Sequence, residues 1–293
     1  MTAMPTPYSN TNAAPVATIG IALRWAIVAL RKTSTTAQLD AETLVMHITG
    51  FSRAELVARG PHELSAAQAA DLARLVERRA TGEPIAYLTH TREFWSLELM
   101  VSPSTLIPRP ETELLVEQAL ALIPTDVAWT IADLGTGCGA IALALAKERP
   151  RCHVVAIDNV PATLDIVQKN AWRHKLKNIE FLQGSWFEPL AARVNMVVSN
   201  PPYIRNDDPH LAWGDVRFEP DYALLGGVDG LDAIRHIVAH AKDYLYPDGI
   251  LLLEHGYDQG MAVCSLMQHH GYSDIACHQD IACRDRVSVC QGR

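Results

Sequence analysis

The sequence has no apolar run long enough to cross a membrane, so we expect no membrane-spanning helix. Its six cysteines include no C-x-x-C pair, and we therefore expect reduced thiols in a cytoplasmic protein. Basic residues are in the minority, with 25 Lys and Arg against 33 Asp and Glu and a net charge of −8. This balance argues against a protein whose affinity comes from neutralising phosphates, and it is compatible with a protein partner. The sequence also lacks internal repeats and any serine or cysteine nucleophile in a hydrolase-like setting.

The N-terminal segment, residues 1–14, is rich in Thr, Asn and Pro and lacks a basic start. We interpret it as a disordered tail, neither a signal peptide nor part of a core. The whole chain has 293 residues, of which 48% are apolar. That length and composition predict a globular protein with a large core and room for two domains.

Residues 15–88 show apolar residues at helical spacing, for example between Ile19 and Leu30, and we predict an N-terminal helical bundle. A capping box at Ser65–Gln68 begins a further helix, which we expect to end at Gly82. The bundle is either a lobe that only adds stability or a domain that docks the substrate. The residues themselves do not separate these two roles.

Residues 89–108 alternate in β-type fashion and predict a hairpin that links two domains. Over residues 109–293 strands and helices alternate, which predicts an α/β domain with a mostly parallel sheet. The predicted strands lie near residues 129–134, 153–157, 178–183, 195–199, 249–254, 272–279 and 285–291. We expect the last two to form an antiparallel end of the sheet.

The tetrapeptide Asn200-Pro201-Pro202-Tyr203 follows an apolar run that we interpret as a buried strand. Two prolines cannot continue that strand, because each lacks a donor N–H and fixes its own φ. The chain should therefore leave the sheet as a stiff, extended corner. Such a corner lies at the carboxyl end of a strand, where open α/β sheets hold ligands.

The side chains of this corner suit a planar amino group. The Asn200 side-chain oxygen and the Pro201 carbonyl are two acceptors at a fixed separation, and together they can hold both N–H bonds of such a group. Tyr203 supplies a ring that can lie on its plane. An amide or aromatic amine, whose nitrogen is a poor nucleophile, fits this arrangement. The alternative is a proline turn in which Tyr203 is only a packing residue.

A glycine loop, Gly135-Thr136-Gly137-Cys138-Gly139, stands between a β-type run and an alanine-rich helical segment. Glycines permit a tight turn and a close approach of the backbone to a ligand. The pattern is G-x-G-x-G and differs from the G-x-G-x-x-G of dinucleotide-binding proteins, so alone it is a weak signal. The next predicted strand ends at Asp158, whose carboxylate can accept hydrogen bonds from both hydroxyls of a ribose. Alternatively, Asp158 caps the helix that begins near Pro161.

The glycine loop, the acidic strand end and the Asn-Pro-Pro-Tyr corner together resemble S-adenosylmethionine-dependent methyltransferases that modify planar nitrogens. The similarity becomes closer through six further segments: Arg92–Ser96, Val101–Pro103, Ile107–Glu113, Val216–Pro220, Gly226–Leu231 and Leu253–Gly256. They are similar to segments of the release factor glutamine methyltransferase family, and the similarity extends from about residue 20 to the end of the chain.

This resemblance implies a Rossmann-like class I S-adenosylmethionine-dependent methyltransferase domain, preceded by a helical domain that docks the substrate. It implies methyl transfer from S-adenosyl-L-methionine to the side-chain amide of the glutamine in the Gly-Gly-Gln loop of peptide chain release factors. We therefore expect a release factor as the protein partner. We expect neither direct nucleic acid binding nor association with a membrane.

On this resemblance, the expected cofactor-binding residues are Asp133, Gly135, Thr136, Gly137, Gly139, Asp158, Ser185, Trp186 and Asn200. The expected substrate-binding residues are Asn200, Pro201, Pro202 and Tyr203; among these, Asn200, Pro201 and Tyr203 are the expected catalytic residues. Ser185 stands where the family leads us to expect an acidic residue, and a hydroxyl bonds an adenine amino group more weakly than a carboxylate does. Trp186 either lies against the adenine or is a core residue.

Two other functions stay open from the residues alone. An N6-adenine methyltransferase acting on DNA or RNA would use the same corner, although the chain lacks a basic or aromatic-rich recognition segment. A non-catalytic S-adenosylmethionine-binding subunit would have no need of an intact acceptor corner. Arg217 and Glu219 either form a wall of the site or make an ion pair. His236 and His240 lack the glutamate and third ligand of a zinc site, so we expect a solvated helix face and no metal.

Overall fold

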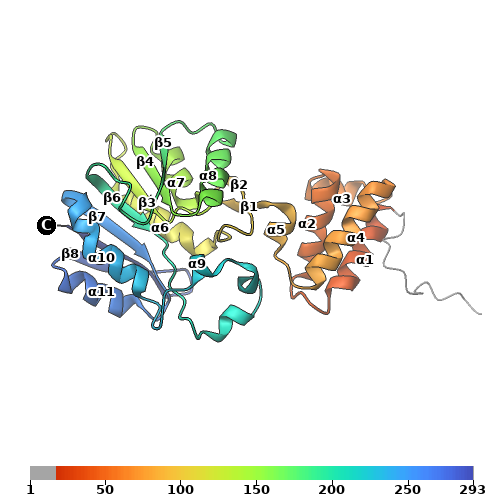
Figure 1. The fold of residues 1–293 in the computed structure, drawn as a ribbon. Helices are drawn as coiled ribbons and strands as arrows, with labels where there is room; N and C mark the ends of the chain where they lie inside the picture. Colours follow the sequence, from red (N-terminus) through yellow and green to blue (C-terminus); the bar gives the residue numbers. More distant parts are fainter. Residues whose placement is uncertain (1–17, 293) are drawn as a thin grey trace, which may run out of the picture. The chain divides into compact units, whose positions relative to one another are not determined.

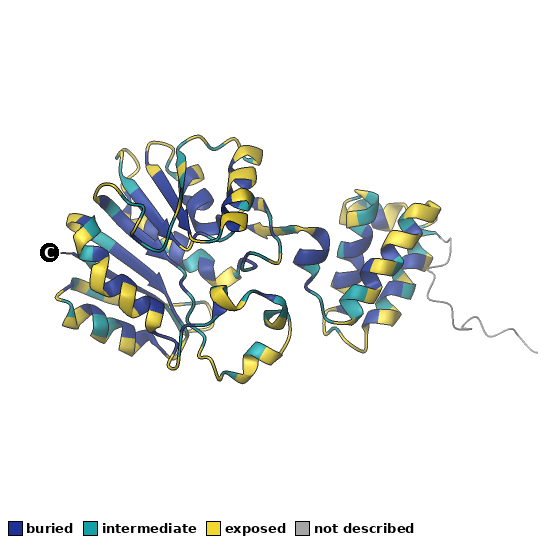
Figure 2. Cartoon of the chain, viewed as in Figure 1, coloured by how far each residue is buried: buried dark blue, intermediate teal, exposed yellow. Residues whose placement is uncertain are grey.

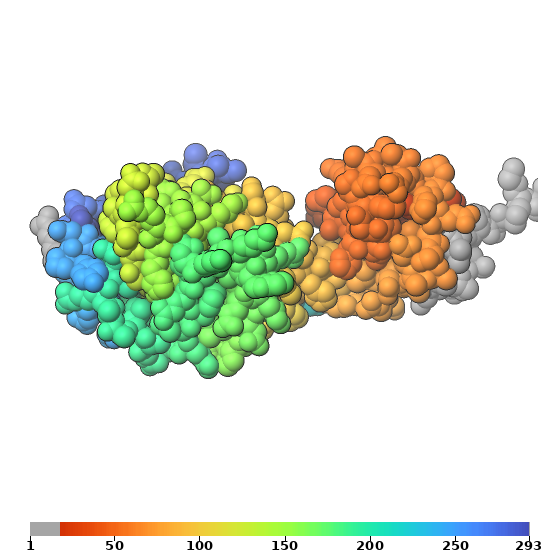
Figure 3. Space-filling view, turned by 90° about the horizontal axis from the view of Figure 1, so that it is seen from above, coloured from red at the N-terminus to blue at the C-terminus, as the bar shows by residue number. Residues whose placement is uncertain are grey.

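The structure is a computed structural model that describes residues 18–292 (Figure 1). The expected tail, residues 1–14, lies outside the described residues. The chain divides into two compact units, and the division falls between Thr89 and His90. Each unit is closely packed in itself, with the first drawn in red to orange and the second in amber to blue (Figure 3).

The described part of the first unit is helical, apart from one isolated β-bridge between Thr18 and Glu63. Its elements are α1 (Ile19–Leu30), α2 (Ala37–Thr49), α3 (Arg53–Ala58), α4 (Ala66–Ala80) and α5 (Ile85–Thr89). The predicted capping box begins α4, where the Ser65 N–H donates to Gln68 Oε1 at 2.9 Å and the Gln68 N–H donates to Ser65 Oγ at 3.2 Å. A second capping box at Ser52 and Glu55, which the sequence analysis did not single out, begins α3.

The second unit contains all nine strands of the described chain. Its elements are β1 (Thr91–Phe94), β2 (Leu97–Met100), a 3₁₀ turn (Pro110–Thr112), α6 (Glu113–Leu122), β3 (Thr130–Leu134), α7 (Ala140–Glu148), β4 (His153–Asp158), α8 (Pro161–Arg173), β5 (Ile179–Gln183), β6 (Val194–Ser199), 3₁₀ turns (Pro209–Ala212 and Val216–Phe218), α9 (Asp221–Leu224), α10 (Asp232–Tyr244), β7 (Leu245–Glu254), α11 (Gly260–His269), β8 (Ser273–Gln279) and β9 (Asp285–Gln291). None of the helices between residues 18 and 292 is long and apolar enough to span a bilayer.

The hairpin of β1 and β2, expected as a linker, falls within the second unit. Its two turn residues, Trp95 and Ser96, have positive φ values of 52° and 53°. Contacts with the helices of this unit hold the turn in that conformation. The Trp95 N–H donates to Glu113 Oε1 at 3.0 Å, and the Trp95 indole donates to Glu148 Oε1 at 3.1 Å.

Seven strands form one sheet in the order β5-β4-β3-β6-β7-β9-β8. Strands β3 to β7 are parallel, and β9 is antiparallel to both β7 and β8. This arrangement confirms the predicted α/β fold class with an antiparallel end. From β3 the chain builds outward through β4 to β5 and then returns to the other side of β3 as β6. The carboxyl ends of β3 and β6 therefore meet at the point where the strand order reverses, which is where sheets of this class bind ligands.

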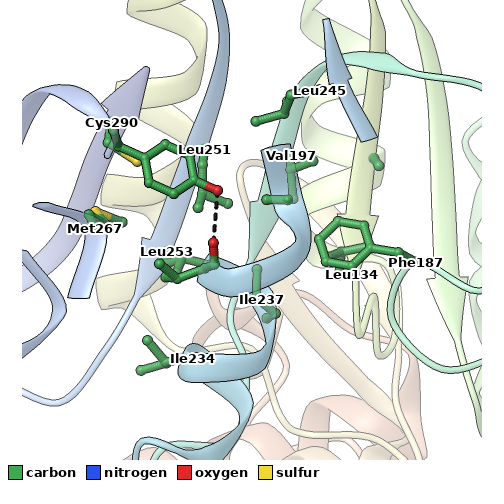
Figure 4. Packing of buried hydrophobic residues seen from close by; sticks show 14 of the residues in the cluster. Leu134, Phe187, Val197, Ile234, Ile237, Leu245, Leu251, Leu253, Met267 and Cys290 are labelled. Carbon is green, nitrogen blue, oxygen red and sulfur yellow. Dashed lines mark hydrogen bonds between the residues drawn. The ribbon is translucent and has the colours of Figure 1, made fainter. Parts of the chain in front are cut away.

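Helices pack against the sheet, and apolar side chains of the strands form the core with them. Alternate residues of the strands, among them Leu134, Val197 and Leu253, share one cluster with Ile237 of α10 and Met267 of α11 (Figure 4). Helices α7 and α8 contact β4. The central strands β3, β4 and β6 are consequently mostly buried, whereas the edge strands β5 and β8 and the outward sides of the helices are more exposed (Figure 2).

Candidate active site

The glycine loop follows β3 and is tied to the neighbouring strand β4. The N–H groups of Gly135 and Thr136 both donate to the Ile157 carbonyl at 2.9 Å. Gly135, Gly137 and Gly139 have φ values of 71°, 58° and 90°, in the left-handed region that favours glycine. A Cβ on Gly137 would meet nothing within 4 Å, whereas a Cβ on Gly139 would lie 2.3 Å from Val167 Cγ2. Gly137 thus leaves space beside the loop, and Gly139 allows α7 to pack closely against α8.

Asp133 lies beneath this loop and is fully buried. Its Oδ2 atom accepts hydrogen bonds from Thr136 Oγ1 at 2.7 Å and from the Ala142 N–H at 3.2 Å. Burial raises the pKa of Asp133 to about 7, while these two hydrogen bonds act in the opposite direction. Asp133 therefore supports the loop from below and does not line the cavity described next.

A cavity opens at the carboxyl ends of β3, β4 and β6. Its lining includes the loop from Gly135 to Cys138, Asp158, the segment Gly184–Trp186, Asn200 and Pro202. Most residues expected to hold cofactor and acceptor thus face one space. Four of the expected site residues are not part of its lining: Asp133, Gly139, Pro201 and Tyr203.

Asp158 serves the loop and the cavity at once. Its Oδ2 atom accepts the Gly137 N–H at 3.0 Å, and its Oδ1 atom accepts the Val160 N–H at 3.0 Å, just before α8 begins. Burial raises the pKa of Asp158, and backbone N–H groups, including those of Val160 and Gly137, partly offset this effect. Each carboxylate oxygen keeps a lone pair that can accept a further hydrogen bond from a ligand.

Ser185 and Trp186 form another wall, after β5. The Ser185 N–H donates to Glu188 Oε2 at 3.2 Å, and Ser185 lines the cavity. Trp186 has a φ of 50° and lines the cavity with part of its ring surface while also packing against the core cluster. The ring of His236 on α10 lies 6.2 Å from the Trp186 ring, centroid to centroid.

The Asn-Pro-Pro-Tyr corner follows β6 and is held by side chains from distant parts of the second unit. Asn200 Nδ2 donates to Thr112 Oγ1 at 3.2 Å, and the Tyr203 hydroxyl donates to Glu254 Oε1 at 3.2 Å. Glu254 ends β7 and is only 1% exposed. Burial raises the pKa of Glu254 to about 7, and the hydroxyls of Thr112 and Tyr203 act against this rise.

Several cavity residues were not singled out from the sequence. Ser104, Leu106, Pro108 and Thr112 come from the proline-rich segment before α6, and Tyr222 comes from α9. The Tyr222 hydroxyl donates to the Ser104 carbonyl at 2.7 Å and joins these two walls. The motif Ile107–Glu113 was the signal that pointed to this segment, but it did not identify which side chains face the cavity.

The other weak candidates also have places in the structure. Glu219 is buried and accepts two hydrogen bonds of 2.7 Å from the Arg109 guanidinium, so its ion-pair partner is Arg109. Arg217 stacks its guanidinium over the Phe218 ring at 4.8 Å. His240 Nδ1 donates to the His236 carbonyl at 2.8 Å on α10. Among residues 18–292, no group of three or more His, Cys, Asp or Glu side chains is arranged to hold a metal ion.

Two family models match the chain. The PrmC N-terminal domain matches residues 22–89, and the methyltransferase small domain matches residues 110–215. Three relatives are named release factor glutamine methyltransferase. Those of Salmonella typhimurium and Escherichia coli K12 are each 50% identical over 85% of this chain and 90% of their own length. That of Vibrio cholerae is 48% identical over 94% of this chain and 96% of its own length.

Solved structures agree in fold. A methyltransferase from Pyrococcus furiosus is 16% identical, with a TM-score of 0.52, and the match covers 74% of this chain and 98% of that one. The 16S rRNA N2 G1207 methyltransferase of T. thermophilus, solved with AdoMet and guanosine, is 21% identical, with a TM-score of 0.50. That second match covers 69% of this chain and 50% of the other. At these identities the likeness concerns the fold alone.

Proposed function

The chain belongs to the release factor glutamine methyltransferase family, and from that membership we propose that it transfers a methyl group from S-adenosyl-L-methionine to a glutamine side-chain amide of a peptide chain release factor. Asn200, residues 135–138 of the glycine loop and Asp158 line one cavity, and this observation supports the assignment of the reaction to these residues. The acceptor is the glutamine of the Gly-Gly-Gln loop. Glycines beside it would let the backbone approach the corner closely.

We call the glycine loop Gly135–Gly139, Asp158 and the pair Ser185–Trp186 the donor half of the cavity. Its residues fit the cofactor. Asp158 has lone pairs left for two ribose hydroxyls, and the open space beside Gly137 admits a ligand close to the backbone. Trp186 offers an apolar surface for the adenine ring. When bound there, the cofactor supplies a methyl group attached to a positively charged sulfur.

We call the corner Asn200–Tyr203, together with Thr112 and Glu254, the acceptor half of the site; of these residues, Thr112, Asn200 and Pro202 line the cavity. Because Asn200 Nδ2 donates to Thr112, its Oδ1 atom is the end of the amide that can accept from the substrate. The Pro201 carbonyl would provide the second acceptor, so that both N–H bonds of the glutamine amide are held, although Pro201 is not itself part of the cavity lining. Tyr203 completes the corner, and its hydroxyl bond to Glu254 fixes the position of the ring.

The reaction depends more on the alignment of the amide nitrogen with the methyl carbon than on general acid–base catalysis. An amide nitrogen is barely nucleophilic because its lone pair is conjugated, and gripping both N–H bonds directs that lone pair toward the methyl carbon. Correct positioning can lower a barrier by about 7–11 kcal/mol. The new N–C bond forms as the S–C bond breaks, and the surplus proton on nitrogen is acidic and leaves to water afterwards. A water-poor cavity favours this step because charge disperses as the groups react.

The helical unit, residues 18–89, would dock the body of the release factor while its loop enters the cavity. An acidic chain with a net charge of −8 suits a protein acceptor better than a nucleic acid. The protein would act in the cytoplasm, where its six free cysteines would stay reduced. Removing the helical unit should raise KM for an intact release factor far more than for a short peptide carrying the Gly-Gly-Gln loop.

A methyl-transfer assay tests the proposal. Purified protein and isotopically labelled donor are incubated in parallel with a release factor and with adenine-containing DNA and RNA oligonucleotides. The proposal requires label on the release factor, located by mass spectrometry as one methyl group on the loop glutamine. Label on adenine with an unmodified release factor would instead support an N6-adenine methyltransferase.

A further inference from the structure

We infer that Thr112 and Glu254 are positioning residues that fix which end of the Asn200 amide faces the acceptor. This inference rests on the proposed function, in which the Asn200 oxygen holds a substrate N–H. An Asn side chain has a donor end and an acceptor end of nearly the same shape. A flip of the Asn200 side-chain amide about its Cβ–Cγ bond would place the Asn200 NH2 group against the NH2 group of the substrate. The hydrogen bond from the substrate N–H to the Asn200 oxygen would then be lost.

Thr112 provides the contact that prevents such a turn. It is 3% exposed, it lines the cavity, and its Oγ1 atom accepts the Asn200 Nδ2 hydrogen bond. A hydroxyl has one proton to donate and lone pairs with which to accept. If its proton is engaged elsewhere, Thr112 can only accept from Asn200. The Asn200 nitrogen must then face Thr112 and its oxygen must face the cavity.

Glu254 is the partner that can engage that proton. The Thr112 side chain lowers the pKa of the Glu254 carboxyl, which places its hydroxyl close to that carboxyl, and the buried Oε2 atom of Glu254 has no hydrogen-bond partner among the described residues. Above its pKa of about 7 the Glu254 carboxylate is ionised and only accepts hydrogen bonds, so in that form it imposes a direction on the whole series. With the Thr112 hydroxyl donating to this unpaired Oε2 atom, hydrogen bonds would run from Asn200 to Thr112 and from Thr112 to Glu254.

The same carboxyl also holds the other end of the corner. Tyr203 donates to Glu254 Oε1, so one buried group organises both Asn200 and Tyr203. Glu254 does not line the cavity, and we assign it no direct contact with substrate or cofactor. Since it is 1% exposed, water offers no replacement for these contacts. Its role is therefore to orient, through Thr112, the residue that makes the contact.

Two substitutions at position 112 separate orientation from simple packing. Thr112→Val keeps the shape and removes the hydroxyl, whereas Thr112→Ser keeps the hydroxyl. Thr130→Val, at the start of β3 and outside the cavity lining, serves as a matched control. For the full-length protein with a release factor, we expect Thr112→Val to lower kcat about tenfold or more, since small misplacements of reacting groups cost up to about 100-fold. Cofactor Kd should stay unchanged, and Thr112→Ser and Thr130→Val should keep most of the kcat.

A double variant shows whether Thr112 acts through Asn200. If it does, adding Thr112→Val to Asn200→Ala should cause no further loss of turnover. Normal kcat in Thr112→Val, or equal damage from Thr112→Ser, would overturn the inference. A further loss of the same size in the double variant would also overturn it. If Asn200→Ala itself keeps full turnover, the proposed function of the corner fails first, which distinguishes the two failures.

Discussion

In the donor half of the cavity, backbone atoms hold the residues in place. Gly135 and Thr136 donate their N–H groups to the Ile157 carbonyl, and Gly137 donates to Asp158. In the acceptor half, side chains hold side chains: Asn200 bonds Thr112, and Tyr203 bonds Glu254. The donor half is thus part of the strand-loop-helix geometry that any sequence with suitable glycines can adopt. The acceptor half depends on individual side chains from separate segments.

This difference leads to different expected responses to substitution. Changes in the donor half should alter folding or cofactor affinity, because the loop geometry serves both. Changes in the acceptor half should alter turnover while the cofactor still binds.

The largest effect should come from adding a methyl group at Gly139. Its φ of 90° disfavours any side chain, and the new Cβ would lie 2.3 Å from Val167 Cγ2. We expect Gly139→Ala to lower the free energy of unfolding by about 2–5 kcal/mol, combining the left-handed backbone penalty with overpacking. Gly137→Ala is the control, because a Cβ there meets nothing within 4 Å and should cost only about 1–2 kcal/mol. Urea unfolding of both variants, monitored by tryptophan fluorescence, measures the difference in the free energy of unfolding. Equal losses in the two variants would show that close packing of Gly139 against Val167 does not contribute to stability.

Replacing Asp158 should weaken the cofactor without stopping the protein from folding. In Asp158→Ala the hydrogen bonds to a charged group are lost, and we expect a loss of about 1.5–3 kcal/mol of binding. Isothermal titration calorimetry with S-adenosyl-L-methionine measures this change. Wild-type affinity in the variant would show that Asp158 only supports the loop and the turn before α8.

The pH dependence of stability should reveal the buried carboxyl of the acceptor half. Burial raises the pKa of Glu254 from 4.5 to about 7; Thr112, Tyr203 and Arg286 lower it, and Glu111 raises it. Between these two pKa values the folded state binds a proton that the unfolded state has released. The free energy of unfolding should therefore fall as pH rises from 5 to 7, with this group contributing about 1 kcal/mol per pH unit.

The variant Glu254→Gln isolates this contribution, because it keeps the shape and cannot titrate. Asp133 and Glu219 have pKa values raised to about 7 in the same way, so they add a slope of the same sign to both proteins. We expect the variant to show the shallower dependence in urea unfolding between pH 5 and 7. Identical slopes would mean that Glu254 does not change its charge in this range.

The smallest effect concerns Ser185, where the family resemblance leads us to expect an acidic residue. Ser185 lines the cavity next to Trp186. A carboxylate there would bond the adenine amino group more strongly, and we expect Ser185→Asp to improve cofactor binding by about 0.5–1 kcal/mol. Calorimetry against Ser185→Ala gives the comparison. Weaker binding in Ser185→Asp would show that the nearby carboxylates of Asp158 and Glu188 make a further negative charge unfavourable.

The donor half could be predicted because its pattern is local in the sequence. Three glycines after a strand and an acidic residue at the end of the next strand indicated it once they were combined with the Asn-Pro-Pro-Tyr corner, and the Gly137–Asp158 bond joins residues only 21 positions apart. The seven strands of the main sheet also appear near their predicted positions, and the clearest signals come from central strands such as β4 and β6, whose buried residues make apolar runs. Strand β7 begins earlier than expected, at Leu245, because Pro247 and Gly249 interrupt the apolar pattern that marks a strand.

The acceptor half was only partly predictable. Asn200 was found from its proline context, but Thr112 lies 88 positions before it, and Glu254 lies 51 positions after Tyr203. No local pattern indicates such pairings, because they depend on which strands become neighbours. For the same reason the tetrapeptide alone did not indicate that the Tyr203 hydroxyl bonds Glu254. The turn at Trp95 and Ser96 was also hidden, since neither residue is a usual choice for positive φ.

The most direct test of the account measures cofactor binding and methyl transfer in one sample of Asn200→Ala. With labelled donor at a saturating concentration and a release factor as acceptor, bound donor is quantified by equilibrium dialysis and transferred methyl by mass spectrometry of the loop glutamine. The account predicts nearly normal donor binding and a single-turnover rate reduced by about 100- to 1,000-fold, as for loss of one preorganised polar group. Wild-type methylation of the glutamine by Asn200→Ala, or a loss of donor binding as large as the loss of rate, would contradict it.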